Sequence, residues 1–256
     1  MSVAVRLLQL TDCHLKASPE GLVKGWPTRR SLDVAVEAAL ARLDGLPDAI
    51  LATGDISQDG SAESYGHFRD RLAGLGVPVL CIPGNHDDPG TMAAACSGPP
   101  FSFCGDAAFG DWRIVLLSTW DGDRGGGRLG TPELERLGAT LAAAREGHAL
   151  VVLHHHPLPV GSRWLDGVAL DDAARFLEVV DAADRVRGVL WGHVHQVFDD
   201  RRNGVRYLGT PSTCFQFRPH TDVPEIDEPG PAWRVLELHP DGTIRTDVGW
   251  APWRPE

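Results

Sequence analysis

The chain has 256 residues, 43% of them hydrophobic, with 24 basic and 35 acidic side chains and a formal net charge of -11. This length suits one large α/β domain with a sizeable core, and the composition excludes a disordered chain. An acidic total without a basic stretch argues against a protein that binds the phosphate backbone of nucleic acid. Any anionic ligand must therefore find its positive charge locally, for example on bound metal ions.

The cysteines and the apolar segments indicate where the protein resides. Its five cysteines are an odd number and include no CxxC pair, which is typical of reduced thiols in a cytosolic protein. The apolar run at residues 3–10 is too short for a secretory signal. No stretch of the sequence approaches the roughly 18 apolar residues that a membrane-spanning helix needs. We therefore expect a soluble cytoplasmic protein without a membrane partner.

Short apolar runs alternate with helical patterns through the first three quarters of the chain, which is typical of an α/β sandwich. The expected strands are residues 5–10, 49–53, 77–82, 114–118, 149–153 and 186–191. Helical spacing predicts helices after residue 28 up to residue 45, over residues 62–75, near 132–145 and over 171–183. From about residue 196 the pattern changes to β-hairpins, with tight turns at Asn203-Gly204 and Asp241-Gly242. Because no linker or repeat interrupts it, residues 1–256 are expected to form a single domain.

Polar motifs directly follow most of the expected strands. They are Asp12-Cys13-His14, Gly54-Asp55, Gly84-Asn85-His86-Asp87, His154-His155-His156-Pro157 and Gly192-His193-Val194-His195. Ligand sites in α/β sheets gather at the carboxyl ends of strands, so these side chains should meet. Because residues i and i+2 of an extended chain share a face, the DxH and HxH motifs should each aim two ligands at one position. Carboxylate, imidazole and amide groups without thiolate favour Mn, Fe or Zn over Ca.

Each motif alone occurs often as a turn or a cap, but all five in this order resemble the signature of the calcineurin-like metallophosphoesterases. That signature is DxH, GD, GNH[DE], a histidine before Pro, and GHxH. Segments 164–166, 210–217 and 233–238 further resemble bacterial class III 3',5'-cyclic-AMP phosphodiesterases. The resemblance implies an α/β fold, a metallophosphoesterase-type sandwich of two mixed β-sheets flanked by helices. It also implies hydrolysis of 3',5'-cyclic AMP to 5'-AMP by a metal-bridging hydroxide.

The resemblance implies two divalent or mixed-valence metal ions, with Fe or Mn expected and Zn as the alternative. The first ion would be held by Asp12, His14, Asp55 and His195, and the second by Asp55, Asn85, His155 and His193. Asp55 would therefore bridge the two ions. Strand alternation allows either His155 or the pair His154 and His156 to face the metals. The family's ligand stands two residues before Pro157, which selects His155.

The same resemblance assigns catalytic and substrate-binding roles. His86 is expected to protonate the leaving oxygen as a general acid, with Asp87 orienting it, while Asn85 stabilises charge on the phosphoryl oxygens. The expected substrate-binding residues are His14, Asn85, His86 and His195. Cys13, in the middle of DxH, is a potential thiolate beside a metal. His220 is a further candidate for a substrate contact.

Two other functions compete with cyclic AMP hydrolysis. The same metal centre would also serve a phosphodiesterase for glycerophosphodiesters or other small phosphodiesters. A second alternative is a fold that has lost catalysis and acts as a binding scaffold. A scaffold should have damaged ligand positions, whereas here all seven positions and His86 are intact. The expected partner is therefore a small-molecule phosphodiester and not nucleic acid, and a homodimer is the expected assembly.

Overall fold

Helices and strands alternate along most of the chain, as the sequence pattern predicts. The first sheet contains β1 (Val5–Leu10), β4 (Ala49–Thr53), β5 (Val79–Ile82), β6 (Phe101–Phe103), β15 (Ala232–Leu238) and β16 (Ile244–Trp250). The second contains β7 (Gly105–Phe109), β8 (Trp112–Leu116), β9 (His148–Val152), β10 (Val186–Trp191), β11 (Phe198–Arg202) and β12 (Val205–Gly209). Two small hairpins are β2 (Leu22–Val23) with β3 (Trp26–Pro27), and β13 (Gln216–Phe217) with β14 (Ile226–Asp227). The helices are α1 (Thr28–Leu43), α2 (Ala62–Ala73), α3 (Pro89–Ala95), α4 (Gly130–Ala143), α5 (Arg163–Asp166) and α6 (Ala173–Asp181).

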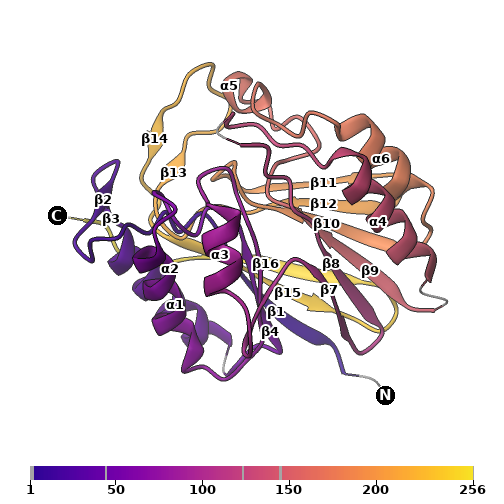
Figure 1. The fold of residues 1–256 in the computed structure, drawn as a ribbon, viewed down its shortest axis with the longest axis horizontal. Coiled ribbons are helices and arrows are strands. Elements are labelled where there is room, and N and C mark those ends of the chain that lie inside the picture. Colours follow the sequence, from indigo (N-terminus) through magenta and orange to yellow (C-terminus); the bar gives the residue numbers. More distant parts are fainter. Residues whose placement is uncertain (1–2, 44, 123, 144–145, 256) are drawn as a thin grey trace.

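Two six-stranded sheets face each other, and helices cover the outer face of each (Figure 1). This computed structural model describes residues 3–43, 45–122, 124–143 and 146–255. The strand order is β16-β15-β1-β4-β5-β6 in one sheet and β11-β12-β10-β9-β8-β7 in the other. Four neighbouring strands of each sheet are parallel, and antiparallel strands complete it. The prediction of two mixed sheets flanked by helices is confirmed.

The core follows from side-chain alternation along the strands. In β4, Ala49 and Leu51 face the space between the sheets, while Ile50 and Ala52 face the layer of α1, α2 and α3. Helices α4 and α6 cover the second sheet in the same way. Both faces of the central strands are therefore buried, which explains why their sequences are continuously apolar.

Several predicted boundaries are accurate, and the differences have local causes. Strands β1, β4 and β10 have the predicted limits. Strand β5 begins at Val79 and not at residue 77, because Pro78 has no N–H to donate to the sheet. The helix predicted near 132–145 is observed as α4, and residues 144–145 lie outside the described residues. The hairpins at Asn203-Gly204 and Asp241-Gly242 are present. Short elements such as α3 and α5 were not predicted.

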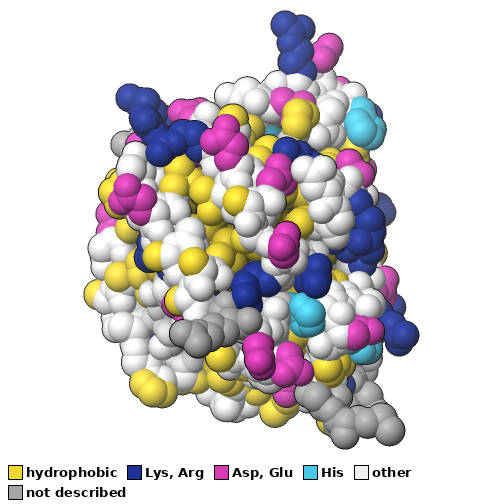
Figure 2. Space-filling model, turned by 90° about the vertical axis from the view of Figure 1, so that its right-hand side faces the viewer, with side chains coloured by type: hydrophobic (Ala, Val, Ile, Leu, Met, Phe, Trp, Pro, Cys, Tyr) yellow, Lys and Arg dark blue, Asp and Glu magenta, His cyan; other side chains and the backbone are white. Residues whose placement is uncertain are grey.

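The outer surface carries charges of both signs. Exposed and half-buried ion pairs include Arg113 with Asp106 and Arg206 with Asp199. Figure 2 shows one face of the molecule, on which acidic and basic side chains are interspersed. Among the described residues, no helix is both long enough and apolar enough to cross a membrane.

A buried polar network joins the strands that precede the first two motifs. Arg234 on β15 is 2% exposed, and its Nε donates a hydrogen bond to Thr210 Oγ1 (2.8 Å). Thr210 donates in turn to Gln9 Oε1, and Gln9 Nε2 donates to Thr53 Oγ1 (2.8 Å). Since Gln9 is in β1 and Thr53 ends β4, this network fixes where both strands end.

Replacing Arg234 by methionine should lower the free energy of unfolding by about 2–4 kcal/mol, because buried acceptors lose their donor. Urea denaturation followed by tryptophan fluorescence measures this loss. The exposed Arg245→Met is the control and should change stability by less than about 0.5 kcal/mol. An equally small effect at Arg234 would show that the network does not stabilise the fold.

Candidate metal centre

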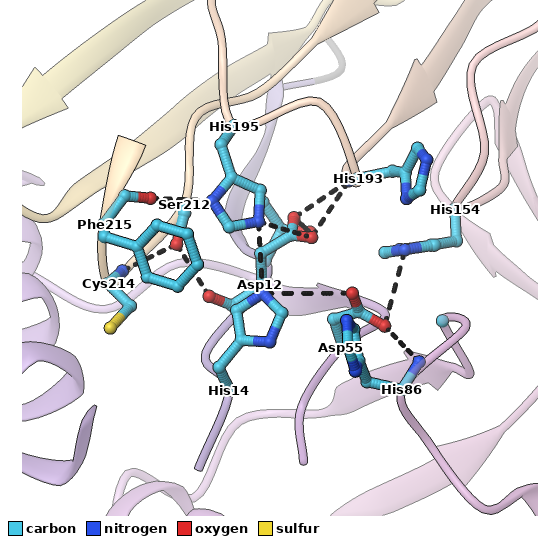
Figure 3. A network of polar contacts seen from close by, with 12 residues as sticks. Asp12, His14, Asp55, His86, His154, His193, His195, Ser212, Cys214 and Phe215 are labelled. Atoms are coloured by element: carbon cyan, nitrogen blue, oxygen red, sulfur yellow. Dashed lines mark hydrogen bonds and ion pairs between the residues drawn. The ribbon is translucent and has the colours of Figure 1, made fainter. Parts of the chain in front are cut away.

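Residues from all five motifs meet where parallel strands of both sheets end, and Figure 3 shows most of them from close by. Three strands of the first sheet, β1, β4 and β5, are followed by the motifs that begin at Asp12, Gly54 and Gly84. In the second sheet, β9 and β10 are followed by the triple histidine and by the GHxH motif. Donor atoms within 4.8 Å of one another occur in the groups Asp12/His14/His195, Asp12/Asp55/His154, His14/Asp55/His86 and His154/His155/His193. The two sheets therefore supply one continuous cluster of donors.

The backbone at these positions is left-handed and not extended. The φ angles are 54° at Asp12, 48° at His14, 49° at Asp55, 65° at His193 and 50° at His195. Residues other than glycine rarely adopt this conformation, which costs about 1–2 kcal/mol each and persists where surrounding structure enforces it. Asp12 and His14 do fall in one group of donors, through sharp turns and not along an extended chain. His193 and His195 fall in different groups, so the prediction that the HxH motif aims both ligands at one position was wrong.

The first group of donors consists of Asp12, His14 and His195. His14 Nε2 lies 3.1 Å from His195 Nε2, which is 3.3 Å from Asp12 Oδ1. His195 Nδ1 donates to the carbonyl of Phe215 (2.7 Å), so its Nε2 keeps a free lone pair. Burial lowers the pKa of His14 to about 3. Its imidazole is therefore neutral near pH 7 and can also act as a ligand.

Asp55 lies between this group and the histidines of the second sheet. Its Oδ2 is 3.9 Å from His14 Nε2, and its Oδ1 is 3.5 Å from His154 Nε2 (Figure 3). Burial opposes the charged carboxylate, but His154 and His14 hold the pKa of Asp55 well below its usual range. A Cβ atom at Gly84 would lie 2.2 Å from Asp55 Oδ1, so only glycine allows the next loop to approach this carboxylate. One ionised carboxylate thus faces both sides of the site.

The triple histidine departs from the expected alternation. Strand β9 ends at Val152, so the three histidines follow a bend and all are fully buried. Because donor atoms of the adjacent His154 and His155 fall in one group with His193, the argument that only His155, or only His154 and His156, could face the site was wrong. His154 Nε2 lies 3.3 Å from Asn85 Oδ1 and close to Asp55, while its Nδ1 donates to the carbonyl of Thr53 (2.8 Å).

The ring of His155 packs against those of His154 and His193, with centroids 4.9 Å and 4.5 Å away. Its Nδ1 is 2.7 Å from Thr119 Oγ1, and its Nε2 is buried without a hydrogen-bond partner among the described residues. His193 Nε2 donates to the carbonyl of Val168 (3.1 Å), which leaves its Nδ1 free. Burial lowers the pKa values of His155 and His193 well below the usual value, so both rings are neutral. The geometry favours His154 over His155 as the partner of Asp55 and Asn85.

These donors suit transition-metal ions. Separations of 3.1–3.3 Å between donor atoms of the first group are those expected when each lies about 2.0–2.2 Å from one ion. Neutral imidazoles held at one nitrogen by a backbone carbonyl are typical metal ligands. Cys13 is fully buried, and burial raises the pKa of its thiol. Because the thiol stays protonated, the donor set remains nitrogen and oxygen.

The GNHD motif divides into a cleft-facing part and a buried part. His86 is exposed, and its Nδ1 accepts a hydrogen bond from Gln58 Nε2 (2.9 Å). Asp87 is buried and accepts hydrogen bonds from Gly84 N (2.8 Å) and Ser57 N (2.9 Å). Burial and the charge on Asp55 raise the pKa of Asp87 to about 7.

The expectation that Asp87 orients His86 is thus not matched by any contact between the Asp87 carboxylate and the His86 ring among the described residues. Asp87 instead joins the loop after β4 to the loop after β5. Gln58 is the residue that the sequence reasoning missed. Its position in the motif loop, three residues after Asp55, is the signal that could have indicated it.

A cleft of about 610 Å³ opens above these donors. All four residues predicted to bind substrate line it, namely His14, Asn85, His86 and His195. Residues of the β2–β3 hairpin, of α5 and of β13 also line it. His220, also a candidate, does not line this cleft: it packs beside Gly161, and its N–H donates to Ser162 Oγ (2.9 Å).

Sequence comparison now defines the class of protein. Residues 5–197 match the model of the calcineurin-like phosphoesterase family, so the chain belongs to this family. It is 41% identical to the 3',5'-cyclic adenosine monophosphate phosphodiesterase CpdA of Vibrio vulnificus, over 96% of this chain and 89% of the relative. The identity to CpdA of Escherichia coli is 40%, over 95% of this chain and 89% of the relative.

Comparison of structures supports the fold. A dimetal phosphatase from Danio rerio superposes with a TM-score of 0.68 at 13% identity, covering 96% of this chain and 99% of that one. GAP50, the anchor in the inner membrane complex of Plasmodium, superposes with a TM-score of 0.66 at 12% identity, covering 98% of this chain and 86% of that one. At such low identity these similarities show the fold alone.

Replacing Asp55 by alanine should abolish tight binding of both metals, because this carboxylate faces both groups of donors. Elemental analysis after desalting gives the metal content per chain. Replacing the exposed Asp222 by alanine is the matched control. Two tightly bound metals in the Asp55 variant would contradict a shared ligand.

The histidine triplet gives a second prediction. His154→Ala should lose metal from the second position, since its Nε2 faces Asp55 and Asn85, whereas His155→Ala should retain more metal. The same elemental analysis compares the two variants, with circular dichroism to verify that both are folded. A greater loss in the His155 variant would restore His155 as the ligand.

Proposed function

We propose that this protein hydrolyses 3',5'-cyclic AMP to 5'-AMP at a centre that holds two metal ions. The observation that carries the proposal is the buried Asp55 carboxylate, which faces His14 on one side and His154 on the other. Relatives named 3',5'-cyclic adenosine monophosphate phosphodiesterase, 37–41% identical over at least 95% of this chain, support the choice of substrate.

The proposed ligands of the first ion are Asp12, His14, Asp55 and His195, and those of the second are Asp55, Asn85, His154 and His193. Iron and manganese are the proposed metals, because the donors are nitrogen and oxygen, with zinc as the alternative. Two such ions, when bound, would lower the pKa of a water molecule between them and polarise the phosphoryl oxygens.

The chain's own residues then position the substrate and move a proton. Asn85 lines the cleft, where its amide can hydrogen-bond a phosphoryl oxygen as charge develops. Because the Gln58 amide N–H donates to Nδ1 of His86, the neutral ring carries its proton on Nε2. His86 is exposed in the cleft, so Nε2 can deliver this proton to the departing ribose oxygen.

Charge also favours a small anionic substrate. The sequence contains only two lysines, Lys16 and Lys24, and both line the cleft. In a chain with a net charge of -11, these ammonium groups provide local positive charge where an anion must enter. The intact donor set argues against a scaffold without catalysis. Glycerophosphodiesters remain the competing substrate class.

The five cysteines, none of which forms a disulfide, support a cytoplasmic setting for this enzyme. A homodimer stays a prediction.

A hydrolysis panel tests the proposed substrate. Cyclic AMP, cyclic GMP, glycerophosphodiesters and phosphomonoesters are compared at equal concentration on protein of defined metal content. We expect the highest kcat/KM for cyclic AMP, and 5'-AMP as its product. Faster turnover of a glycerophosphodiester, or of a phosphomonoester, would overturn the assignment.

The role of His86 has its own test, based on the leaving group. A ribose hydroxyl needs a proton in the transition state, whereas nitrophenolate departs unaided. His86→Ala should therefore lose roughly 10²-fold or more in turnover of cyclic AMP and far less on bis-nitrophenyl phosphate. Metal content is measured in the same samples. Equal losses on both substrates would place His86 in phosphate positioning instead.

A further inference from the structure

One wall of the cleft is aromatic and continues directly from a candidate metal ligand. The ring centroid of Phe217 on β13 lies 4.8 Å from that of His195. Trp164 on α5 contacts Phe217 edge to face, with ring centroids 4.7 Å apart and planes at 79°. Both side chains are half-buried and line the cleft. The wall thus adjoins the candidate metal centre through His195.

The β2–β3 hairpin forms a short arm that also lines the cleft. Its turn residues, Lys24 and Gly25, have φ angles of 52° and 85°, as a two-residue hairpin turn requires. Leu22 on this arm lines the cleft although its side chain is 58% exposed. Leu22, Trp164 and Phe217 thus give the cleft an apolar lining beside the candidate metal ligands, which suits a flat apolar group of a ligand.

The aromatic wall is held firmly to the metal centre. Gln196 directly follows His195, and its Nε2 donates to Ser162 Oγ (3.2 Å) at the start of α5. Asp166 at the end of α5 accepts a hydrogen bond from Val160 N (2.8 Å). Asp166 also lies 3.6 Å from His156 Nε2. Both ends of this four-residue helix are therefore tied to the loops that carry the metal-binding motifs.

We propose that Trp164 and Phe217 form the nucleobase subsite, in which the base stacks against this wall while the phosphate lies over the metal ligands. This inference rests on the proposed cyclic nucleotide phosphodiesterase activity and adds the residues that select a nucleotide. Aromatic rings stack on bases of any sequence, because every base has a π face. The wall carries no charged side chain of its own, so it favours a base over a charged head group such as that of a glycerophosphodiester.

The test compares a substrate with a base and one without. Kinetics of Trp164→Ala are measured on cyclic AMP and on ribose 3',5'-cyclic phosphate, which lacks the base. Stacking by one aromatic ring should make KM for cyclic AMP rise roughly 10-fold or more. KM for the base-free ester should stay unchanged, and kcat should change little on both. Phe217→Ala should shift the two substrates in the same unequal way, and Trp164→Phe should restore most of the affinity.

A binding measurement separates a direct contact from a structural role. Calorimetry compares 5'-AMP with ribose 5-phosphate on the metal-loaded enzyme, and Trp164→Ala should weaken only the binding of 5'-AMP. Trp250→Ala removes another tryptophan, one that is 38% exposed and does not line the cleft, and should change neither. Equal weakening of both ligands, or none, in a folded Trp164 variant would overturn the subsite.

If the wild type does not hydrolyse cyclic AMP, the proposed function fails. If it does and Trp164→Ala behaves like the wild type, only the subsite fails.

Discussion

Both groups of donors in the site depend on the buried carboxylate of Asp55, which lies between His14 and His154. Asp12 and Asp55 are at most 2% exposed, and burial together with the charge on Asp55 raises the pKa of the neighbouring Asp87. Burying such charges costs several kcal/mol each unless cations or imidazoles offset it. The histidines of the second sheet supply part of this compensation through His154, and two metal ions would supply the rest. The two sheets are thus joined electrostatically as well as by their apolar core.

This constraint explains the unusual backbone at the motif positions. Five candidate ligands have left-handed φ angles, which loops tolerate only where strong neighbouring contacts hold them. The strands below provide that support. Asp87 joins the loops after β4 and β5 by hydrogen bonds. The Arg234 network joins β1 and β4 by buried side-chain hydrogen bonds. The hydrogen-bonded strands around the candidate metal ligands therefore stabilise the strained backbone at these positions.

The sequence predicted much of this architecture, because continuous apolar runs mark buried parallel strands and the polar motifs mark their ends. Strands β1, β4 and β10 were predicted with their observed limits. The positions of side chains were predicted less well where the chain leaves regular strands and helices. Strand alternation could not predict which of His154, His155 and His156 faces the site, because the strand already ends at Val152. The contact between Gln58 and His86 joins two loops 28 residues apart and has no periodic signal. The Trp164–Phe217 wall likewise depends on tertiary packing alone.

The central claim is that a pair of metal ions, sharing Asp55, performs the hydrolysis. Titration of metal-free protein with a single metal, followed by cyclic AMP hydrolysis at each step, tests it most directly. We predict that activity reaches its plateau at two equivalents of metal per chain. If the two metal positions fill in order, activity stays low up to one equivalent. If they fill together, activity rises in proportion to the metal added. Full activity at one equivalent, or activity that survives complete metal removal, would contradict the account.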